Sequence, residues 1–327
     1  MPARIDHADG NLDEAQARLE ESVHTSDANA PGVGGIWLGW LLTDRGDIER
    51  AAPVVEVSQH DRTVTIHHFG LAHRALLAAY TAGLNGRIAE ALSWLQDVES
   101  EVDRRHLCHF VGRSHNYRAW LLRNILATSE ADDLNVTAAG IAAERGLREP
   151  QAHAALELAD GRMRRGDLAA AASFLAQADQ LSETKYAFVW HARLRYALLS
   201  ARLAMADGQW DESDHLATDV VQRAQQLGMV RYVSLARLIS AEARAKGGRP
   251  VDPETVAGVV EHLDRVAGPE AWWITAEVAA ACGVDAWWPA AEQRVARLAS
   301  GAGEYKEQFV RQAGTMLDKI RTSRRSG

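Results

Sequence analysis

The chain has 327 residues, of which 47% are hydrophobic and 24% charged, a composition that excludes an intrinsically disordered protein. Its formal net charge of −8 and pI of about 5.9 argue against a body that binds nucleic acid directly, because neutralising phosphates requires a basic face. The two cysteines, Cys108 and Cys282, are distant in sequence and predict free thiols. No uninterrupted apolar run approaches the ~18 residues of a membrane span, so we expect a cytoplasmic protein without a membrane segment.

A short turn motif recurs along the chain, in which a glycine is followed five residues later by alanine or serine. The glycines at positions 46, 86, 166 and 208 lie 40, 80 and 42 residues apart, and the doubled gap predicts a copy without glycine at 127–135. A repeat of about 40 residues with two helices per unit is typical of an α-solenoid. The motif copies are 10–15, 46–51, 86–91, 166–171 and 208–213, with looser copies at 283–290 and near 247–248.

The copy at 166–171 shows how the motif works. Gly166 suits a left-handed helix end, and Asp167 can cap the amides that open the next helix. Ala171 falls where the two helices would come closest, and only a small side chain permits that approach. The apolar stripe of the second helix is Leu168, Ala171, Ala172, Leu175 and Ala178.

The predicted elements follow in chain order. The first helices of successive units contain 35–42, 71–80, 117–126, 151–162 and 192–206, and the β-branched clusters at 54–57 and 63–66 are interpreted as helix and connection. From 249 the pattern changes, with helices expected at 253–266, 269–281, 286–299 and 304–322, the last an amphipathic cap. We therefore divide the chain into TPR-like repeats at 1–248, the first incomplete, and degenerate repeats, capping helix and basic tail at 249–327.

These motifs resemble the tetratricopeptide repeat (TPR) family, which places small residues in the middle of the first helix, Gly-Asp or Gly-Asn at the turn and alanine in the second helix. The period exceeds the family's usual length of about 34 residues and is similar to that of the helical sensor region of large bacterial signal-transduction ATPases, although the chain has neither a P-loop nor a recognisable helix-turn-helix. The resemblance implies an all-α, right-handed α-solenoid. The matching residues are Gly39, Gly46, Asp47 and Ala51, then Ala79, Gly86 and Ala91, then Ala159, Gly166 and Ala171.

The resemblance also implies that a partner binds on the inner face of the first helices. The family's clamp for peptide termini uses Lys and Asn, which are absent here, so the resemblance does not imply binding of acidic C-terminal peptides. The alternative is that the matching side chains simply pack between units. They are Trp40, Tyr80, His153, Asp160 and Arg202.

Two tryptophan pairs stand out in the C-terminal part, at 272–273 and 287–288. Adjacent side chains on a helix point about 100° apart, so one stripe cannot bury both rings of a pair. One ring of each, Trp273 and Trp287, is therefore a candidate for the groove or an interface. The alternative is a wide core that buries all four rings.

Other polar clusters favour no catalytic or metal site. On a helix His106 and His109 would share a face, but Cys108 and His115 diverge from it, and the set matches no common zinc motif. Asp132 and Asp133 are similar to the Asp-rich motif of helical prenyl-diphosphate enzymes, but the third acid is missing and the segment falls at a repeat turn. We expect a capping cluster there, and neither a metal nor a cofactor.

The sequence thus favours a non-enzymatic protein- or peptide-binding module, acting as a regulatory sensor or adaptor in bacterial signalling or transcription control. One alternative is a sensor of a small-molecule effector, and another is an all-helical enzyme using Asp132 and Asp133. Only nine residues precede the turn at Gly10, so its second helix is expected to lack a partner. Two alternatives would cover that edge: the chain is a fragment of a longer one, or a second subunit forms a homodimer through the N-terminal helix.

Overall fold

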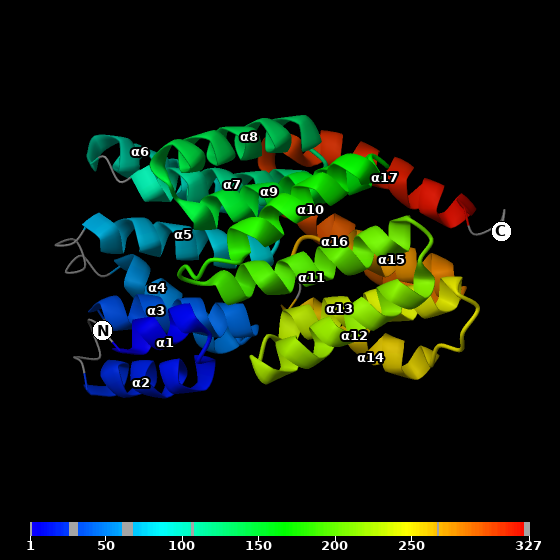
Figure 1. The fold of residues 1–327 in the computed structure, drawn as a ribbon, viewed down its shortest axis with the longest axis horizontal. Coiled ribbons are helices and arrows are strands. Elements are labelled where there is room, and N and C mark those ends of the chain that lie inside the picture. The colour runs from blue at the N-terminus through cyan, green and yellow to red at the C-terminus, as the bar shows by residue number, and fades with distance from the viewer. Residues whose placement is uncertain (1, 26–31, 61–67, 106–107, 267, 324–327) are drawn as a thin grey trace.

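The computed structural model describes residues 2–25, 32–60, 68–105, 108–266 and 268–323, which form 17 α-helices and two short 3₁₀ helices without a strand. Most helices run along the long axis of the molecule, with α1 and the end of α17 toward opposite ends (Figure 1). No helix in the described ranges is long and apolar enough to cross a membrane. The expected all-α superhelix of helix pairs is confirmed.

In the described part of the chain, the helices form eight consecutive pairs followed by a single last helix. The first helices of the pairs are α1 (Pro2–Asp9), α3 (Gly32–Arg45), α5 (His68–Leu84), α7 (Cys108–Asn124), α9 (Arg148–Arg164), α11 (Val189–Ala206), α13 (Val230–Lys246) and α15 (Ala271–Cys282). The second helices are α2 (Leu12–Thr25), α4 (Ile48–His60), α6 (Ile88–Arg105), α8 (Thr128–Arg145), α10 (Leu168–Ser182), α12 (Trp210–Gln226), α14 (Pro253–Val266) and α16 (Trp288–Gly301), and the last helix is α17 (Lys306–Ser323).

The turns between paired helices form as the motif predicts. Gly166 has a φ of +77°, and the Asp167 side chain accepts a hydrogen bond from the Ala170 amide at 3.2 Å. In the copy without glycine, Leu126 adopts the same left-handed conformation with a φ of +66°. The small residue that follows the turn is fully buried in six copies: Ala15, Ala51, Ala91, Ala131, Ala171 and Ser213.

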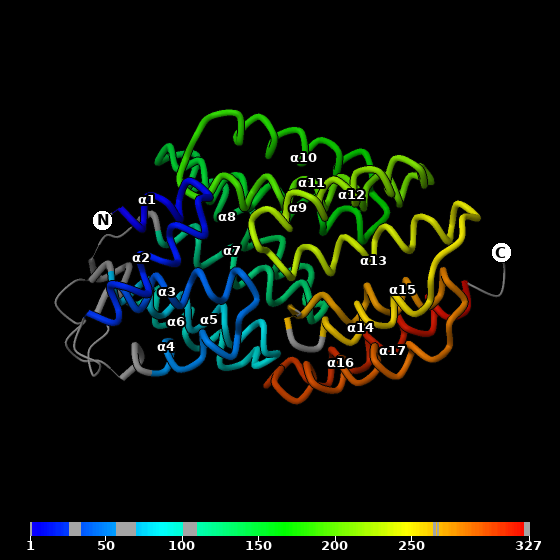
Figure 2. The backbone as a smooth tube through the Cα atoms, turned by 90° about the horizontal axis from the view of Figure 1, so that it is seen from below, coloured from blue at the N-terminus to red at the C-terminus, as the bar shows by residue number. Residues whose placement is uncertain are grey.

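The superhelix turns back on itself, so that late helices meet early ones (Figure 2). The Phe188 amide, just before α11, donates a hydrogen bond to the Ala8 carbonyl of α1 at 2.9 Å. Gly46, at the end of α3, lies against Val230 and Val266, and a Cβ on Gly301 of α16 would lie 2.1 Å from the Gly86 carbonyl oxygen. The inner faces of the first helices are therefore partly enclosed.

The N-terminal helix differs from the expectation of an unpartnered edge. α1 packs against α2 and against α11, and its His7 is 1% exposed. The short helix α1 therefore serves as the partner of α2, and hydrogen bonds from Phe188 and Trp190 hold it against the start of α11. Among the described residues, Ile5 is the large apolar side chain that this helix exposes. Pairing of two copies through this region stays a prediction.

The C-terminal part follows the sequence-based boundaries closely, and α17 packs on α15 and α16. Phe309 of α17 meets the Trp272 ring edge-on, with 5.9 Å between the ring centroids. All four tryptophans of the two pairs are buried. The core is wide enough for adjacent rings because α15 packs between α13 on one side and α16 and α17 on the other. The basic tail at 324–327 and the cluster at 63–66 lie outside the described residues.

Candidate functional site

A chamber with a cavity volume of about 110 Å³ lies on the inner side of the superhelix, and we call it the large chamber. It is built mainly by the first helices of successive pairs, which contribute one or more turns each. Its lining residues are His7, Trp37, Trp40, Asp44, His73, Leu76, Tyr80, Arg113, Asn116, Tyr117, Trp120, Glu149, Pro150, His153, Glu157, Phe188, Trp190, His191, Arg195 and Arg231.

One wall of the large chamber is aromatic. Trp40 of α3 stacks on Tyr80 of α5 with 5.7 Å between the ring centroids and 20° between the planes. Tyr80 in turn contacts Tyr117 at 5.5 Å and Trp120 at 5.9 Å, both from α7. The indole N–H of Trp40 is buried and has no hydrogen-bond partner among the described residues. The wall thus offers flat apolar surface together with a free donor, a combination typical of ligand-binding pockets.

The opposite wall contains two histidines held in the neutral form. Burial lowers the pKa of His153 from 6.5 to about 3, and the nearby positive charge of Arg195 adds to this. Burial also lowers the pKa of His191 well below its usual value. The two rings lie 5.5 Å apart, and His191 Nε2 is 3.3 Å from the Tyr232 hydroxyl. At neutral pH these imidazoles offer both hydrogen-bond donors and acceptors without carrying charge.

A second cavity of about 40 Å³, which we call the small chamber, adjoins the first and shares Trp120, Arg195 and Arg231 with it. Its lining comes mainly from α7, α9, α11, α13 and α15. Its lining residues are Trp120, Asn124, Asp160, Arg164, Arg195, Leu198, Leu199, Arg202, Arg231, Tyr232, Leu235, Glu270, Trp273 and Ile274.

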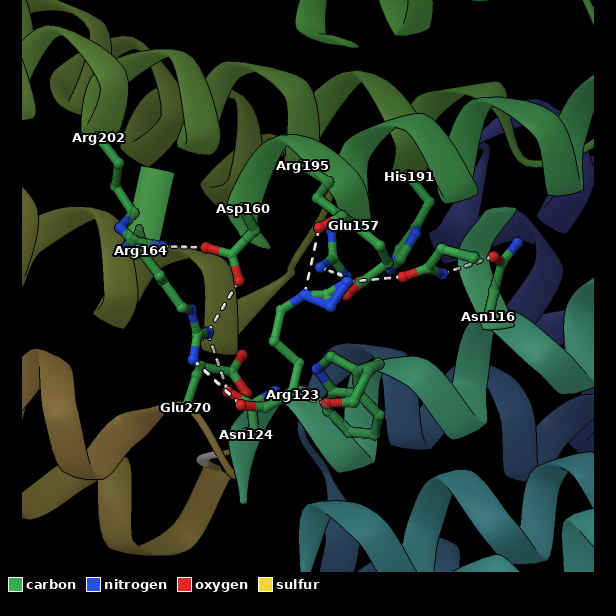
Figure 3. A network of polar contacts seen from close by, with 12 residues as sticks. Asn116, Arg123, Asn124, Glu157, Asp160, Arg164, His191, Arg195, Arg202 and Glu270 are labelled. Carbon is green, nitrogen blue, oxygen red and sulfur yellow. Dashed lines mark hydrogen bonds and ion pairs between the residues drawn. The ribbon is translucent and has the colours of Figure 1, made fainter. Parts of the chain in front are cut away.

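Ion pairs line the boundary between the chambers (Figure 3). Arg195 pairs with Glu157, and Arg231 pairs with Glu270. Asp160 pairs with two cations at once, Arg164 at 2.8 Å and Arg202 at 2.5 Å. Burial alone would raise the pKa of the Asp160 carboxyl, but the two guanidinium groups outweigh it and hold that pKa below its usual value. Asp160 is therefore ionised in the folded protein.

Arg123 anchors this network from beneath, with a side chain that is 0% exposed. Its Nη2 donates to the Asn135 side chain at 2.7 Å and lies 3.1 Å from Asp132 Oδ1, and its Nε donates to the Glu157 carbonyl at 3.2 Å. A buried cation requires such partners because desolvation without them costs several kcal/mol. Asp132 is thus an ion-pair partner of Arg123, and also of Arg165.

The residues predicted from the sequence lie in three places. Trp40, Tyr80 and His153 line the large chamber, and Asp160, Arg202 and Trp273 line the small one. Trp287 forms part of the 3₁₀ helix η2 (Asp285–Trp287), is 6% exposed and is in neither lining set. The structure therefore gathers six of the seven around two adjoining cavities, while their role in binding stays a prediction.

Sequence reasoning missed Glu157, Arg195 and Arg231, which line one or both chambers. A signal for the first two was present. On α9, Glu157 follows His153 by four residues and precedes Asp160 by three, and on α11 Arg195 precedes Arg202 by seven. Such spacings place side chains on one face of a helix, so each helix has a polar inner stripe beside its apolar ones.

The weaker candidates for metal chemistry gain no support. Within the described residues, no group of three or more His, Cys, Asp or Glu side chains could hold a metal ion. His115 lies 3.4 Å from Glu99 instead. His106 lies outside the described residues.

No protein-family model matches this chain, and no curated protein matches it. Among solved structures, the chain is similar to a Rap protein in the crystal structure of its complex with competence and sporulation factor. The TM-score is 0.59 at 10% sequence identity, and the match covers 95% of this chain and 94% of that chain. At this identity the likeness shows the fold alone, a TPR-like helical repeat over nearly the full length.

Proposed function

We propose that this protein is a non-enzymatic regulatory module that binds a short peptide in the two inner chambers. The observation that supports this most is the joining of an aromatic wall to a row of buried ion pairs across five first helices, α3 to α11. A peptide presents both apolar side chains and backbone amides, and the chambers match each with rings or hydrogen-bonding groups. The Rap protein, complexed with competence and sporulation factor, supports the idea that such a superhelix holds a regulatory ligand.

The regulatory part of the proposal rests on residues shared between the large chamber and the closure of the superhelix. His7 of α1 and Trp190 of α11 line the chamber and also join these two helices. The Trp37 ring stacks parallel to Phe188 at 6.2 Å, which links α3 to the same contact. A ligand against these side chains would change how firmly the first helix is held, and an attached or partner protein could sense that change.

Peptide binding is tested with a synthetic pool of random hexapeptides, incubated with the protein and separated from it by size exclusion. Mass spectrometry of the protein fraction identifies the retained peptides. We expect the Trp40→Ala variant to retain much less, because it removes the ring that stacks on Tyr80. Trp94→Ala is the matched control, since Trp94 is a partly buried tryptophan in neither chamber. Retention that is equal in all three proteins, or absent from the wild type, would contradict the proposal.

A small-molecule effector is the second candidate, and the predominantly aromatic lining of the large chamber favours it. Native mass spectrometry of protein purified gently from its own host distinguishes the two. A retained mass whose fragmentation gives amino-acid residues supports the peptide, and any other retained organic mass supports the small molecule.

A further inference from the structure

The small chamber contains a local excess of positive charge around Asp160. Each of the other two lining arginines has a carboxylate partner, Arg195 with Glu157 and Arg231 with Glu270. Asp160 is shared by two lining arginines, Arg164 and Arg202, so at this corner of the chamber two positive charges face one negative charge.

Glu277 of the neighbouring α15 does not remove this excess. Burial and the charge of Glu242 raise its pKa to about 7 against the opposing effect of Arg202 and Arg164, so Glu277 carries only part of a negative charge at neutral pH. Glu242 is already paired with Lys246 at 2.6 Å. The corner formed by Arg164 and Arg202 therefore stays cationic.

Trp273 brings these two guanidinium groups together. The Cζ of Arg202 lies 4.0 Å from the centroid of the Trp273 ring, and that of Arg164 lies 4.8 Å from it. Stacking of guanidinium groups on an indole fixes their orientation. The Trp273 side chain is 2% exposed, and its N–H has no hydrogen-bond partner among the described residues.

The small chamber also has more unpaired hydrogen-bond donors than unpaired acceptors. The Nε–H groups of Arg164, Arg195 and Arg231 are buried without a partner in the described part of the chain, as is the Trp273 indole N–H. The Glu270 Oε2 atom is the single acceptor of this kind in the lining. Buried donors are normally satisfied, so four of them around one cavity indicate a ligand that is rich in acceptors.

We propose that the small chamber binds a carboxylate of the ligand at Arg164, Arg202 and Trp273, while the large chamber takes the ligand's apolar side chains. This inference rests on the proposed peptide function and specifies its chemistry. A volume of about 40 Å³ is room for roughly three water molecules, the size of a carboxylate group. Arginine binds carboxylates with two parallel hydrogen bonds, and the indole N–H adds a third donor.

The carboxylate could come from the peptide C-terminus or from an Asp or Glu side chain, and three synthetic hexapeptide pools distinguish these sources. The first pool has a free C-terminus and no Asp or Glu. The second is the same pool with an amidated C-terminus. The third is amidated but includes Asp and Glu. Retention of each pool is measured by size exclusion and mass spectrometry, as above.

We expect the wild type to retain peptides from the first or third pool at least about 10-fold better than from the second, as charge-assisted hydrogen bonds predict. Preference for the first pool assigns a terminal carboxylate, and preference for the third assigns an acidic side chain. Arg202→Gln should abolish the preference. Trp273→Phe should reduce it while preserving an aromatic face, and it removes no hydrogen bond to a described residue, so its folding should be intact by circular dichroism.

Two outcomes contradict the inference in different ways. Equal retention of all three pools, unaffected by Arg202→Gln yet lost in Trp40→Ala, would overturn the carboxylate site and leave peptide binding standing. Failure to retain any pool would overturn peptide binding and the carboxylate site together.

Discussion

The indole N–H of Trp190 donates a hydrogen bond to the carbonyl oxygen of His7 at 3.0 Å, across 183 residues of sequence. This contact joins the first helix of the chain to α11. It also belongs to the lining of the large chamber, so closure of the superhelix and shape of the site depend on the same side chains.

Replacing Trp190 with phenylalanine should lower the free energy of unfolding by about 0.5–1.5 kcal/mol, because the His7 carbonyl loses one of its two donors and keeps the Gly10 amide. Trp273→Phe is the matched control, since that indole N–H is also buried and has no hydrogen-bond partner within the described ranges. Urea unfolding followed by circular dichroism measures both variants. Equal losses would show that the hydrogen bond between α1 and α11 contributes nothing to stability.

Replacing Arg123 with methionine should cost about 1.5–3 kcal/mol, because Asp132 and Asn135 lose a charged hydrogen-bond donor, while Asp132 keeps Arg165 and Glu157 keeps Arg195. Arg87→Met serves as the comparison. Arg87 forms an ion pair with Glu90 in which both side chains are exposed, and such pairs contribute about 0–1 kcal/mol. Denaturant unfolding of the two variants gives the difference, and a small loss for Arg123→Met would mean that water reaches the network.

The neutral state of His153 predicts a pH dependence of stability. The unfolded chain binds a proton at this imidazole near pH 6.5, whereas the folded protein binds it only near pH 3. Between these values the unfolded state holds more protons, so stability falls as the pH falls, by up to about 1.4 kcal/mol per pH unit. His153→Gln should lose this contribution. The stability gap between wild type and variant should therefore change between pH 6.5 and 5.5 but hardly between pH 8 and 7, and parallel curves throughout would contradict the prediction.

The contact between α16 and the turn before α6, which we call the seam, is so close that one added methyl group should disrupt it. A Cβ on Gly301 would lie 2.1 Å from the Gly86 carbonyl oxygen, and a backbone atom cannot move aside as a side chain can. Gly301→Ala should therefore lower the melting temperature and increase the radius of gyration measured by X-ray scattering. Gly314→Ala is the control, because a Cβ there meets nothing within 4 Å and alanine favours the helix. An unchanged radius for Gly301→Ala would show that the seam opens without effect on overall shape.

The repeat architecture could be predicted because it depends on residues that lie close together in sequence. Gly166, Asp167 and Ala171 specify one turn and one close helix contact, and each acts within about ten residues of sequence. The copy without glycine was predicted from spacing alone, and Leu126 there accepts the strained left-handed conformation because the flanking helices fix it. The division at 248 and 249 stays a prediction, although one apolar core cluster includes residues from Leu12 to Leu317.

The candidate site was predicted only in part. Trp40, Tyr80 and His153 were found because the resemblance to TPR repeats indicates the inner face of first helices. Arg231 was missed, because nothing near it in sequence distinguishes it from a solvent-exposed arginine, and its partner Glu270 lies 39 residues later.

The sequence by itself determined the helix pairs, their turns and the face that each first helix turns inward, because these follow from backbone conformation and side-chain size over one or two helical turns. The tertiary structure alone decided that α1 meets α11, that Trp273 lies beside Arg164 and Arg202, and that α16 meets the turn before α6. These contacts depend on the accumulated rotation of many repeats. A small angle in each unit, which no local pattern records, sets where distant helices meet and which charges are left unbalanced between them.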